Sequence, residues 1–156
     1  MESEKEVARF EKARAAGLKT VLFVCTGNAV RSQFAEGLVN HFLKGKWAAF
    51  SGGIIPVKIP KDVVKVMHEI GIDMDAAASK HVDLFKDCRF DKVVVLCSDV
   101  DRMCPNLPEC AEQEHMIFQD PMSSSLLSEG ACFGMKPGLR LLRDEMRKAL
   151  LDYLGE

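Results

Sequence analysis

The chain has 156 residues, 47% of them hydrophobic and 28% charged, and a formal net charge of −2. This length fits one domain, and the composition is that of a globular protein, which excludes a disordered or fibrous chain. The 21 basic and 23 acidic residues are spread along the sequence, so there is no electrostatic footprint for nucleic acid or an anionic membrane, and we expect neither as a partner.

The first predicted element is a helix over residues 4–16, because apolar residues recur there at near-helical spacing before Gly17. We interpret residues 1–18 as a helical extension and residues 19–156 as a single α/β domain. The charged N-terminus has no apolar signal-peptide core, and no run is long enough to cross a bilayer. We therefore expect a cytoplasmic protein.

The rest of the sequence alternates β-prone apolar runs with segments of helical periodicity. The predicted strands are 19–24, 47–50, 92–97 and 114–118, and the predicted helices are 32–43, 61–70 and 137–154. The stretch 122–136 has no clear period and is predicted to be a loop. Alternating strands and helices indicate βαβ crossovers, and hence a three-layer α/β/α domain around a parallel sheet.

Reactive side chains follow three of the predicted strands. Cys25, Cys97 and Asp120 fall at or just beyond the strand ends. Ligands of such sheets bind outside the carboxyl ends of the strands, so we expect the site there. Six cysteines in a chain without a signal peptide indicate catalytic, redox or metal-binding thiols rather than a structural disulfide framework.

The segment from Cys25 to Ser32 predicts an oxyanion site. A tight loop that leads into a helix start turns backbone N–H groups inward, and the helix dipole adds partial positive charge. Arg31 can bond two anion oxygens, and Ser32 can donate its hydroxyl to the thiolate of Cys25, the expected nucleophile. The predicted oxyanion-binding residues are Thr26, Gly27, Asn28, Ala29, Val30 and Arg31. The alternative is that Cys25 is only a small buried residue that ends a strand.

The pattern Cys-x5-Arg-Ser on a strand-loop-helix, followed much later by Asp120-Pro121, resembles the low-molecular-weight tyrosine phosphatases and the thioredoxin-coupled arsenate reductases that share their fold. The resemblance covers about residues 19–154. It implies a four-stranded parallel sheet with helices on both sides, and it implies that Asp120 is the general acid. Without the resemblance, Asp-Pro more often starts a turn.

A second thiol pair, Cys97 and Cys104, resembles the redox segment of the reductases. The resemblance implies a relay in which Cys25 attacks arsenate, Cys97 attacks Cys25, and Cys104 then takes the disulfide to a place where thioredoxin reduces it. No cofactor is implied. Two alternatives stay open: no partnership between Cys97 and Cys104, or a zinc site. The zinc site would use Cys97, Cys104, Cys110 and His115, although no C-x2-C knuckle is present. Cys88, Cys110 and Cys132 are expected to be incidental thiols, although Cys110 or Cys132 could replace the resolving cysteine.

Some of these reductases bind potassium beside the oxyanion loop through four side chains. Asn28, Glu36 and Ser51 match three of them, but Lys80 stands at the fourth position. We therefore expect no metal. The Lys80 ammonium is expected to supply the positive charge to Asn28 and Glu36, which predicts activity that does not depend on potassium.

Arsenate reduction is the leading functional interpretation, because a phosphatase needs no further thiols, whereas two-electron reduction of arsenate needs a thiol pair. Hydrolysis of phosphotyrosine or a small phosphoester is the second. Phosphatases of this kind carry aromatic residues after the Asp-Pro, where Met122 and three serines stand here. A non-catalytic thiol sensor or anion-binding module is the third. We expect a monomer.

Overall fold

The computed structural model describes residues 2–100, 106–119 and 136–155. Its elements in chain order are α1 (Glu2–Ala15), β1 (Lys19–Cys25), α2 (Arg31–Phe42), β2 (Trp47–Gly53), α3 (Lys61–His68), the 3-10 helix η1 (Val82–Phe85), β3 (Phe90–Val95), β4 (Cys110–His115) and α6 (Lys136–Leu154). No described helix is long and apolar enough to cross a bilayer.

The four strands form one parallel sheet in the order β2-β1-β3-β4. The chain moves from β1 to one neighbour, β2, and later returns to the other side of β1 to form β3. The point where strand order reverses therefore lies between β1 and β3, and parallel α/β sheets place their ligands at such a point. This confirms the expected fold class and fixes where the site should lie.

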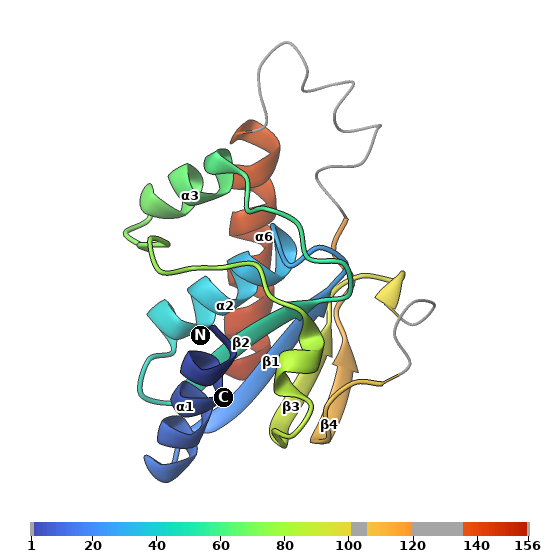
Figure 1. The fold of residues 1–156 in the computed structure, drawn as a ribbon. Coiled ribbons are helices and arrows are strands. Elements are labelled where there is room, and N and C mark those ends of the chain that lie inside the picture. The colour runs from blue at the N-terminus through green and yellow to red at the C-terminus, as the bar shows by residue number, and fades with distance from the viewer. Residues whose placement is uncertain (1, 101–105, 120–135, 156) are drawn as a thin grey trace.

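Helices cover both faces of the sheet (Figure 1). On one face α2 packs beside α6, which also contacts α3. On the other face lie α1 and η1, joined to the sheet by a cluster of edge-to-face aromatic rings: Phe10, Phe50, Phe85 and Phe90. Phe10 is only 3% exposed, so the N-terminal helix contributes directly to the core.

The strand boundaries differ from the sequence prediction at the polar edge. Strand β4 runs from Cys110 to His115, and the prediction of a strand over 114–118 was wrong. The residues of β4 are mostly exposed and form no apolar run, so the sequence pattern did not reveal the strand. Strand β3 ends at Val95, so Leu96 and Cys97 follow the strand instead of closing it. Two glycines and Ser51 extend β2 to Gly53, and α3 ends at His68, two residues early.

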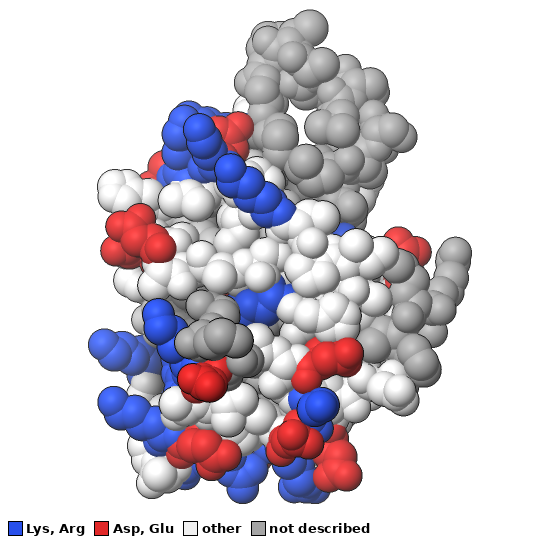
Figure 2. Space-filling model, viewed as in Figure 1, with Lys and Arg blue, Asp and Glu red and all other residues white. Residues whose placement is uncertain are grey.

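The closing helix matches its prediction closely. Helix α6 runs from Lys136 to Leu154, and every residue of the expected core stripe is buried: Leu139, Leu142, Met146, Leu150 and Leu154. On the face shown in Figure 2, acidic and basic side chains of the described residues are interspersed.

Candidate active site

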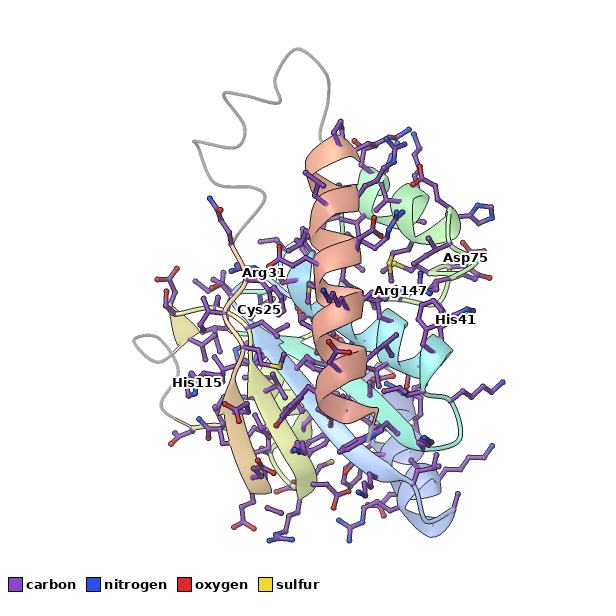
Figure 3. The ribbon with its side chains drawn as sticks, turned by 180° about the vertical axis from the view of Figure 1, so that it is seen from behind. Cys25, Arg31, His41, Asp75, His115 and Arg147 are labelled. Carbon is purple, nitrogen blue, oxygen red and sulfur yellow. The ribbon has the colours of Figure 1, made fainter. Side chains whose placement is uncertain are left out.

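Cys25 ends β1 at the point where strand order reverses, and it is 2% exposed. On one side, the backbone of Cys25 pairs with Gly53 of β2. On the other side lies the segment that follows β3, where the N–H of Leu96 donates to Val24 O at 2.9 Å. Figure 3 shows Cys25 and Arg31 close together at this end of the sheet. The expected nucleophile and guanidinium therefore meet at one site.

A directed chain of hydrogen bonds ends at the Cys25 sulfur. The backbone N–H of Lys80 donates to Asn28 Oδ1 at 2.7 Å, which fixes the amide so that Nδ2 faces Ser32. Asn28 Nδ2 donates to Ser32 Oγ at 2.8 Å, and Ser32 Oγ lies 2.9 Å from Cys25 Sγ. Because Ser32 accepts from Asn28, its own proton is directed toward the sulfur. A charge-assisted hydrogen bond of this kind stabilises the thiolate.

The loop after Cys25 is held from behind by backbone and side-chain contacts. Thr26 O accepts the N–H groups of Ile54 and Ile55, and Gly27 O accepts the N–H of Val57 at 3.0 Å. Asn28 adopts a left-handed backbone with φ of 48°, which Asn tolerates better than most residues. The loop is thus tied to the strand end of β2 along most of its length.

Gly53 is the residue that allows this close approach. A Cβ at position 53 would lie 2.8 Å from Asn28 N and 2.9 Å from Thr26 O. Both are backbone atoms that cannot move aside without displacing the loop, so only glycine fits there.

Two supporting side chains were not anticipated from the sequence. Gln33 Nε2 lies 3.1 Å from Asn28 O and 3.0 Å from Ala78 O, and it also contacts Asn28 Oδ1. Ser79 Oγ donates to Gly27 O at 3.1 Å. Gln33 is one of several polar residues of α2 and gave no distinct signal in the sequence. Nothing near Ser79 in the sequence points to the loop either, because its contact with Gly27 spans 52 residues.

The loop opens toward a helix start. Helix α2 begins at Arg31, and Val30 before it supplies no side-chain cap. Among the hydrogen bonds between described residues, none is donated by the N–H groups of residues 27–30. Arg31 is 8% exposed, and its Nη1 donates to Phe118 O at 3.2 Å. Uncapped N–H groups, a helix dipole and a guanidinium make a cradle for a tetrahedral anion.

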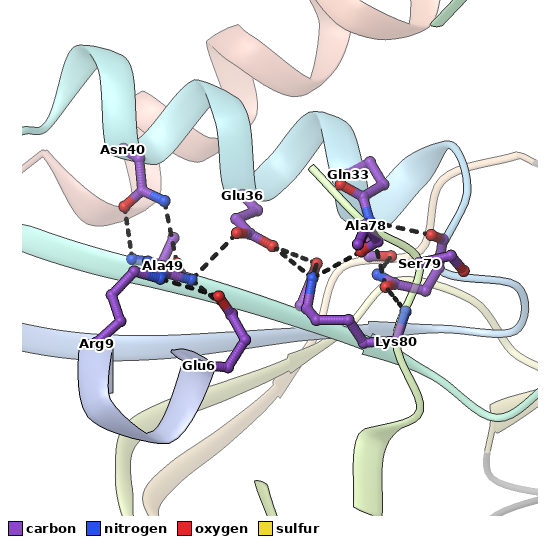
Figure 4. Close-up of polar contacts among 12 residues, drawn as sticks. Glu6, Arg9, Gln33, Glu36, Asn40, Ala49, Ala78, Ser79 and Lys80 are labelled. Carbon is purple, nitrogen blue, oxygen red and sulfur yellow. Dashed lines mark hydrogen bonds and ion pairs between the residues drawn. The ribbon is translucent and has the colours of Figure 1, made fainter. Parts of the chain in front are cut away.

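The side chains expected to support the loop come together behind it (Figure 4). The Lys80 ammonium is buried and lies 3.5 Å from Glu36 Oε1, 3.4 Å from Ser51 Oγ and 3.0 Å from Ala78 O. Ser51 also donates a short hydrogen bond to Glu36. Asn28 contacts the backbone N–H of Lys80 instead of the ammonium, so the expected contact between that charge and Asn28 is corrected: the charge acts on Glu36.

The second thiol lies beside the oxyanion loop. Cys97 is 3% exposed, and its Sγ lies 3.3 Å from the hydroxyl of Thr26, the residue that follows Cys25. Cys25 and Cys97 are both free thiols. Cys104, Asp120 and Cys132 lie outside the described residues.

The remaining described cysteines lie at the far end of the sheet. Cys110 begins β4 opposite Phe90, whereas His115 ends it opposite Val95, so the two are roughly 17 Å apart along an extended strand. The zinc alternative, which needs both, is therefore wrong, and Cys110 is too far from Cys97 to replace Cys104. Burial raises the pKa of the Cys88 thiol, and Glu11 and Asp87 raise it further. No group of three His, Cys, Asp or Glu side chains in the described ranges is arranged to hold a metal ion.

The sequence of this chain resembles those of known proteins. The sequence profile of the low molecular weight phosphotyrosine protein phosphatases matches residues 20–125. Arsenate reductase 2 of Staphylococcus epidermidis is 42% identical over 103 residues, which cover 66% of this chain and 79% of that protein.

Solved structures extend the likeness to most of the chain. A structure described as an arsenate reductase in the phosphate binding state aligns with a TM-score of 0.70 at 25% identity, over 88% of this chain and 98% of that one. A thioredoxin-dependent arsenate reductase of Corynebacterium glutamicum shares the fold, with a TM-score of 0.59 at 22% identity over 97% of this chain and 71% of that one. Since the family profile matches more than half of its residues, the chain belongs to the low molecular weight phosphotyrosine protein phosphatase family.

Proposed function

We propose that this protein reduces arsenate to arsenite through a relay of Cys25, Cys97 and Cys104. The observation that carries the proposal is the buried Cys97 thiol, 3.3 Å from the hydroxyl of Thr26 in the oxyanion loop. Hydrolysis of a phosphate ester needs no second thiol at this place. Relatives with 40% to 42% identity that are named arsenate reductases support the same activity.

The first step uses the oxyanion loop. The Cys25 thiolate attacks the arsenic of arsenate, while Arg31 and the N–H groups of the loop hold the oxygens. Asp120 protonates a leaving oxygen, which departs as water. Ser32 stabilises the thiolate before the attack, through the hydroxyl that lies 2.9 Å from Cys25 Sγ.

The second step transfers two electrons. The Cys97 thiolate attacks Cys25 Sγ, a disulfide forms between the two sulfurs, and the S–As bond breaks with its electron pair moving to arsenic, which leaves as arsenite. The hydroxyl of Thr26 is placed to stabilise Cys97 as a thiolate for this attack. Cys104 then attacks Cys97 by thiol–disulfide exchange, which releases Cys25 as a thiolate.

Reduction of the final Cys97–Cys104 disulfide requires an external dithiol. We assign this role to thioredoxin, whose low reduction potential suits the reduction of a protein disulfide. The proposal uses no metal or organic cofactor, because the three thiols and thioredoxin account for both electrons.

Phosphatase activity is the second candidate, and one surface feature favours it. Val57 packs against Gly27 of the oxyanion loop and is 53% exposed, and Ile55 near it is 54% exposed. An apolar rim beside an oxyanion cradle can accept an aryl ester. This reaction would use Cys25, Arg31 and Asp120 but neither Cys97 nor Cys104.

The deciding experiment measures arsenite production with thioredoxin, thioredoxin reductase and NADPH, in parallel with phosphate release from an aryl phosphate. Cys97→Ser and Cys104→Ser should abolish arsenate turnover, and Cys110→Ser, at the far end of the sheet, should retain it. Phosphate release that survives in all three variants, without arsenate turnover in the unmodified protein, would overturn the reductase in favour of the phosphatase.

A further inference from the structure

The side chain of Arg9 extends from the N-terminal helix toward the back of the active site. Arg9, on α1, donates from Nη2 to Glu36 Oε2 at 3.2 Å and to Glu6 Oε2 at 2.9 Å. Its Nη1 donates to Ala49 O on the edge strand β2 at 3.0 Å, and the guanidinium stacks on Phe50, 3.9 Å from the ring centroid. Figure 4 shows Arg9 on one side of Glu36 and Lys80 on the other.

Glu36 thus lies between two cations, each bonded to a different carboxylate oxygen. Lys80 and Ser51 contact Oε1, whereas Arg9 contacts Oε2. The carboxylate is 19% exposed, so it depends strongly on these partners for compensation of its charge. Loss of either cation should let Glu36 turn and release the groups that it holds.

Those groups lead directly to the nucleophile. Lys80 contacts Glu36 through its ammonium and Asn28 through its backbone N–H. Asn28 in turn orients Ser32, which contacts Cys25 Sγ. These contacts form a continuous series from Glu36 to Cys25. A shift of Glu36 can therefore change the hydrogen bond that stabilises the thiolate.

We infer that Arg9 is a positioning residue for the oxyanion loop, so that the N-terminal helix is part of the catalytic apparatus of this protein. The inference rests on the proposed use of Cys25 as the nucleophile, but not on whether the substrate is arsenate or a phosphate ester. Arg9 touches neither the substrate nor Cys25 and acts through Glu36.

The test compares Arg9→Ala with Arg14→Ala, which removes an arginine from the same helix. Arg14 also packs near an aromatic ring and bonds to a distant carbonyl, that of Arg89 at 2.9 Å, but makes no contact with Glu36. The main readout is the rate at which iodoacetamide alkylates Cys25, measured by peptide mass spectrometry with and without inorganic phosphate. Turnover of arsenate and of an aryl phosphate is measured beside it.

Arg9→Ala should slow alkylation of Cys25 about five- to tenfold, weaken protection by phosphate and lower kcat/KM by a similar factor, because the nucleophile and cradle are less well held. Arg9→Lys should recover part of each effect through its charge. Arg14→Ala should stay within about twofold of the unmodified protein in all three readouts.

Chemical rescue separates positioning from loss of helix packing. Arg9 lines a cavity of about 410 Å³ that also contains Glu6 and Glu36, so a guanidinium ion can enter when the side chain is removed. Low millimolar guanidinium chloride should restore alkylation of Cys25 in Arg9→Ala and leave Arg14→Ala unchanged. If Arg9→Ala does not fold, Arg9→Gln gives the same comparison without the charge.

Equal effects of Arg9→Ala and Arg14→Ala, or the absence of rescue by guanidinium, would overturn the inference. Alkylation and phosphate protection need no turnover. If the protein had no arsenate reductase activity, the proposed reaction would be refuted. The alkylation and phosphate-protection measurements would still decide whether Arg9 positions the oxyanion loop.

Discussion

At the scale of single residues, Lys80 is a cation built into the chain behind the oxyanion loop. Its ammonium is buried and contacts Glu36, Ser51 and the carbonyl of Ala78. We predict equal rates of arsenate turnover in potassium and sodium chloride at matched ionic strength, because this charge already stabilises Glu36. A clear increase in rate on replacing sodium with potassium would contradict this.

Lys80→Met tests the same charge from the protein side. It removes the ammonium but keeps the backbone N–H that holds Asn28. We expect kcat/KM to fall about tenfold, with a smaller change in melting temperature than a lost core residue gives. The reason is that, among the described residues, Arg9 is then the one cationic partner left to the partly buried Glu36. An activity equal to that of the unmodified protein would show that Lys80 is dispensable for the loop.

Gly53 sets how closely the oxyanion loop approaches β2. Gly53→Ala should destabilise the protein by about 1–3 kcal/mol and abolish most activity, because the new Cβ meets two backbone atoms within 3 Å. Gly138→Ala is a matched control, since no described atom lies within 4 Å of a Cβ there and alanine favours α6. Thermal unfolding and phosphate protection of Cys25 measure the two effects; a fully active Gly53→Ala would show that the loop can shift without loss.

At the scale of elements, the end of α3 is joined to α6 by a three-residue ion cluster. Arg140 forms a two-pronged contact with Glu69, with Nη2 to Oε2 at 2.7 Å, and Arg143 donates to Glu69 at 2.9 Å and to Val66 O at 2.7 Å. The hydrogen bonds from Arg140, with help from Arg143, lower the pKa of Glu69 from 4.5 to about 2.

The sign of the pH effect follows from that shift. Between pH 4.5 and about 2 the unfolded state binds a proton at Glu69 that the folded state does not, so this stabilisation is complete above pH 4.5 and is lost as the pH falls toward 2. Glu69→Gln should therefore flatten the dependence of melting temperature on pH in that range. Arg140→Gln should flatten it too, and adding Glu69→Gln to that variant should change little; an unchanged slope in Glu69→Gln would refute the prediction.

How far the elements could be predicted depends on whether their cause is local. The apolar run of β1 and the helical periodicity of α6 are visible within each segment of sequence, and both elements were predicted to within one residue. Strand β4 was misplaced because backbone pairing with β3, not its own residue pattern, makes it a strand. The short helix η1 was missed for a similar reason: His81, which caps it, gives little signal in sequence.

The residues of the site were likewise predictable only where they are close in sequence. Cys25, Arg31 and Ser32 are close in sequence, and the motif placed them correctly at a strand end. Gln33 and Arg9 reach Ala78 and Glu36 through contacts that span 45 and 27 residues, which only the folded chain reveals.

At the scale of the whole molecule, the parallel sheet separates the four cysteines of the described ranges into two groups. Cys25 and Cys97 lie at the carboxyl end of the strands, whereas Cys110 begins β4 and Cys88 lies just before β3. Several strand residues separate the two groups, a distance far beyond the roughly 2 Å of a disulfide bond. Topology therefore limits which cysteines can exchange with Cys25.

A single turnover with arsenate and no thioredoxin tests this separation directly. We predict that two thiols are lost and that peptide mapping finds them joined as Cys97–Cys104, because exchange carries the disulfide away from Cys25. In Cys104→Ser the relay should stop one step earlier, at Cys25–Cys97. Cys88 and Cys110 should be alkylated after denaturation to the same extent as in untreated protein. A disulfide that includes either of them would mean that electrons reach arsenic from a thiol outside the proposed relay, and it would contradict the prediction.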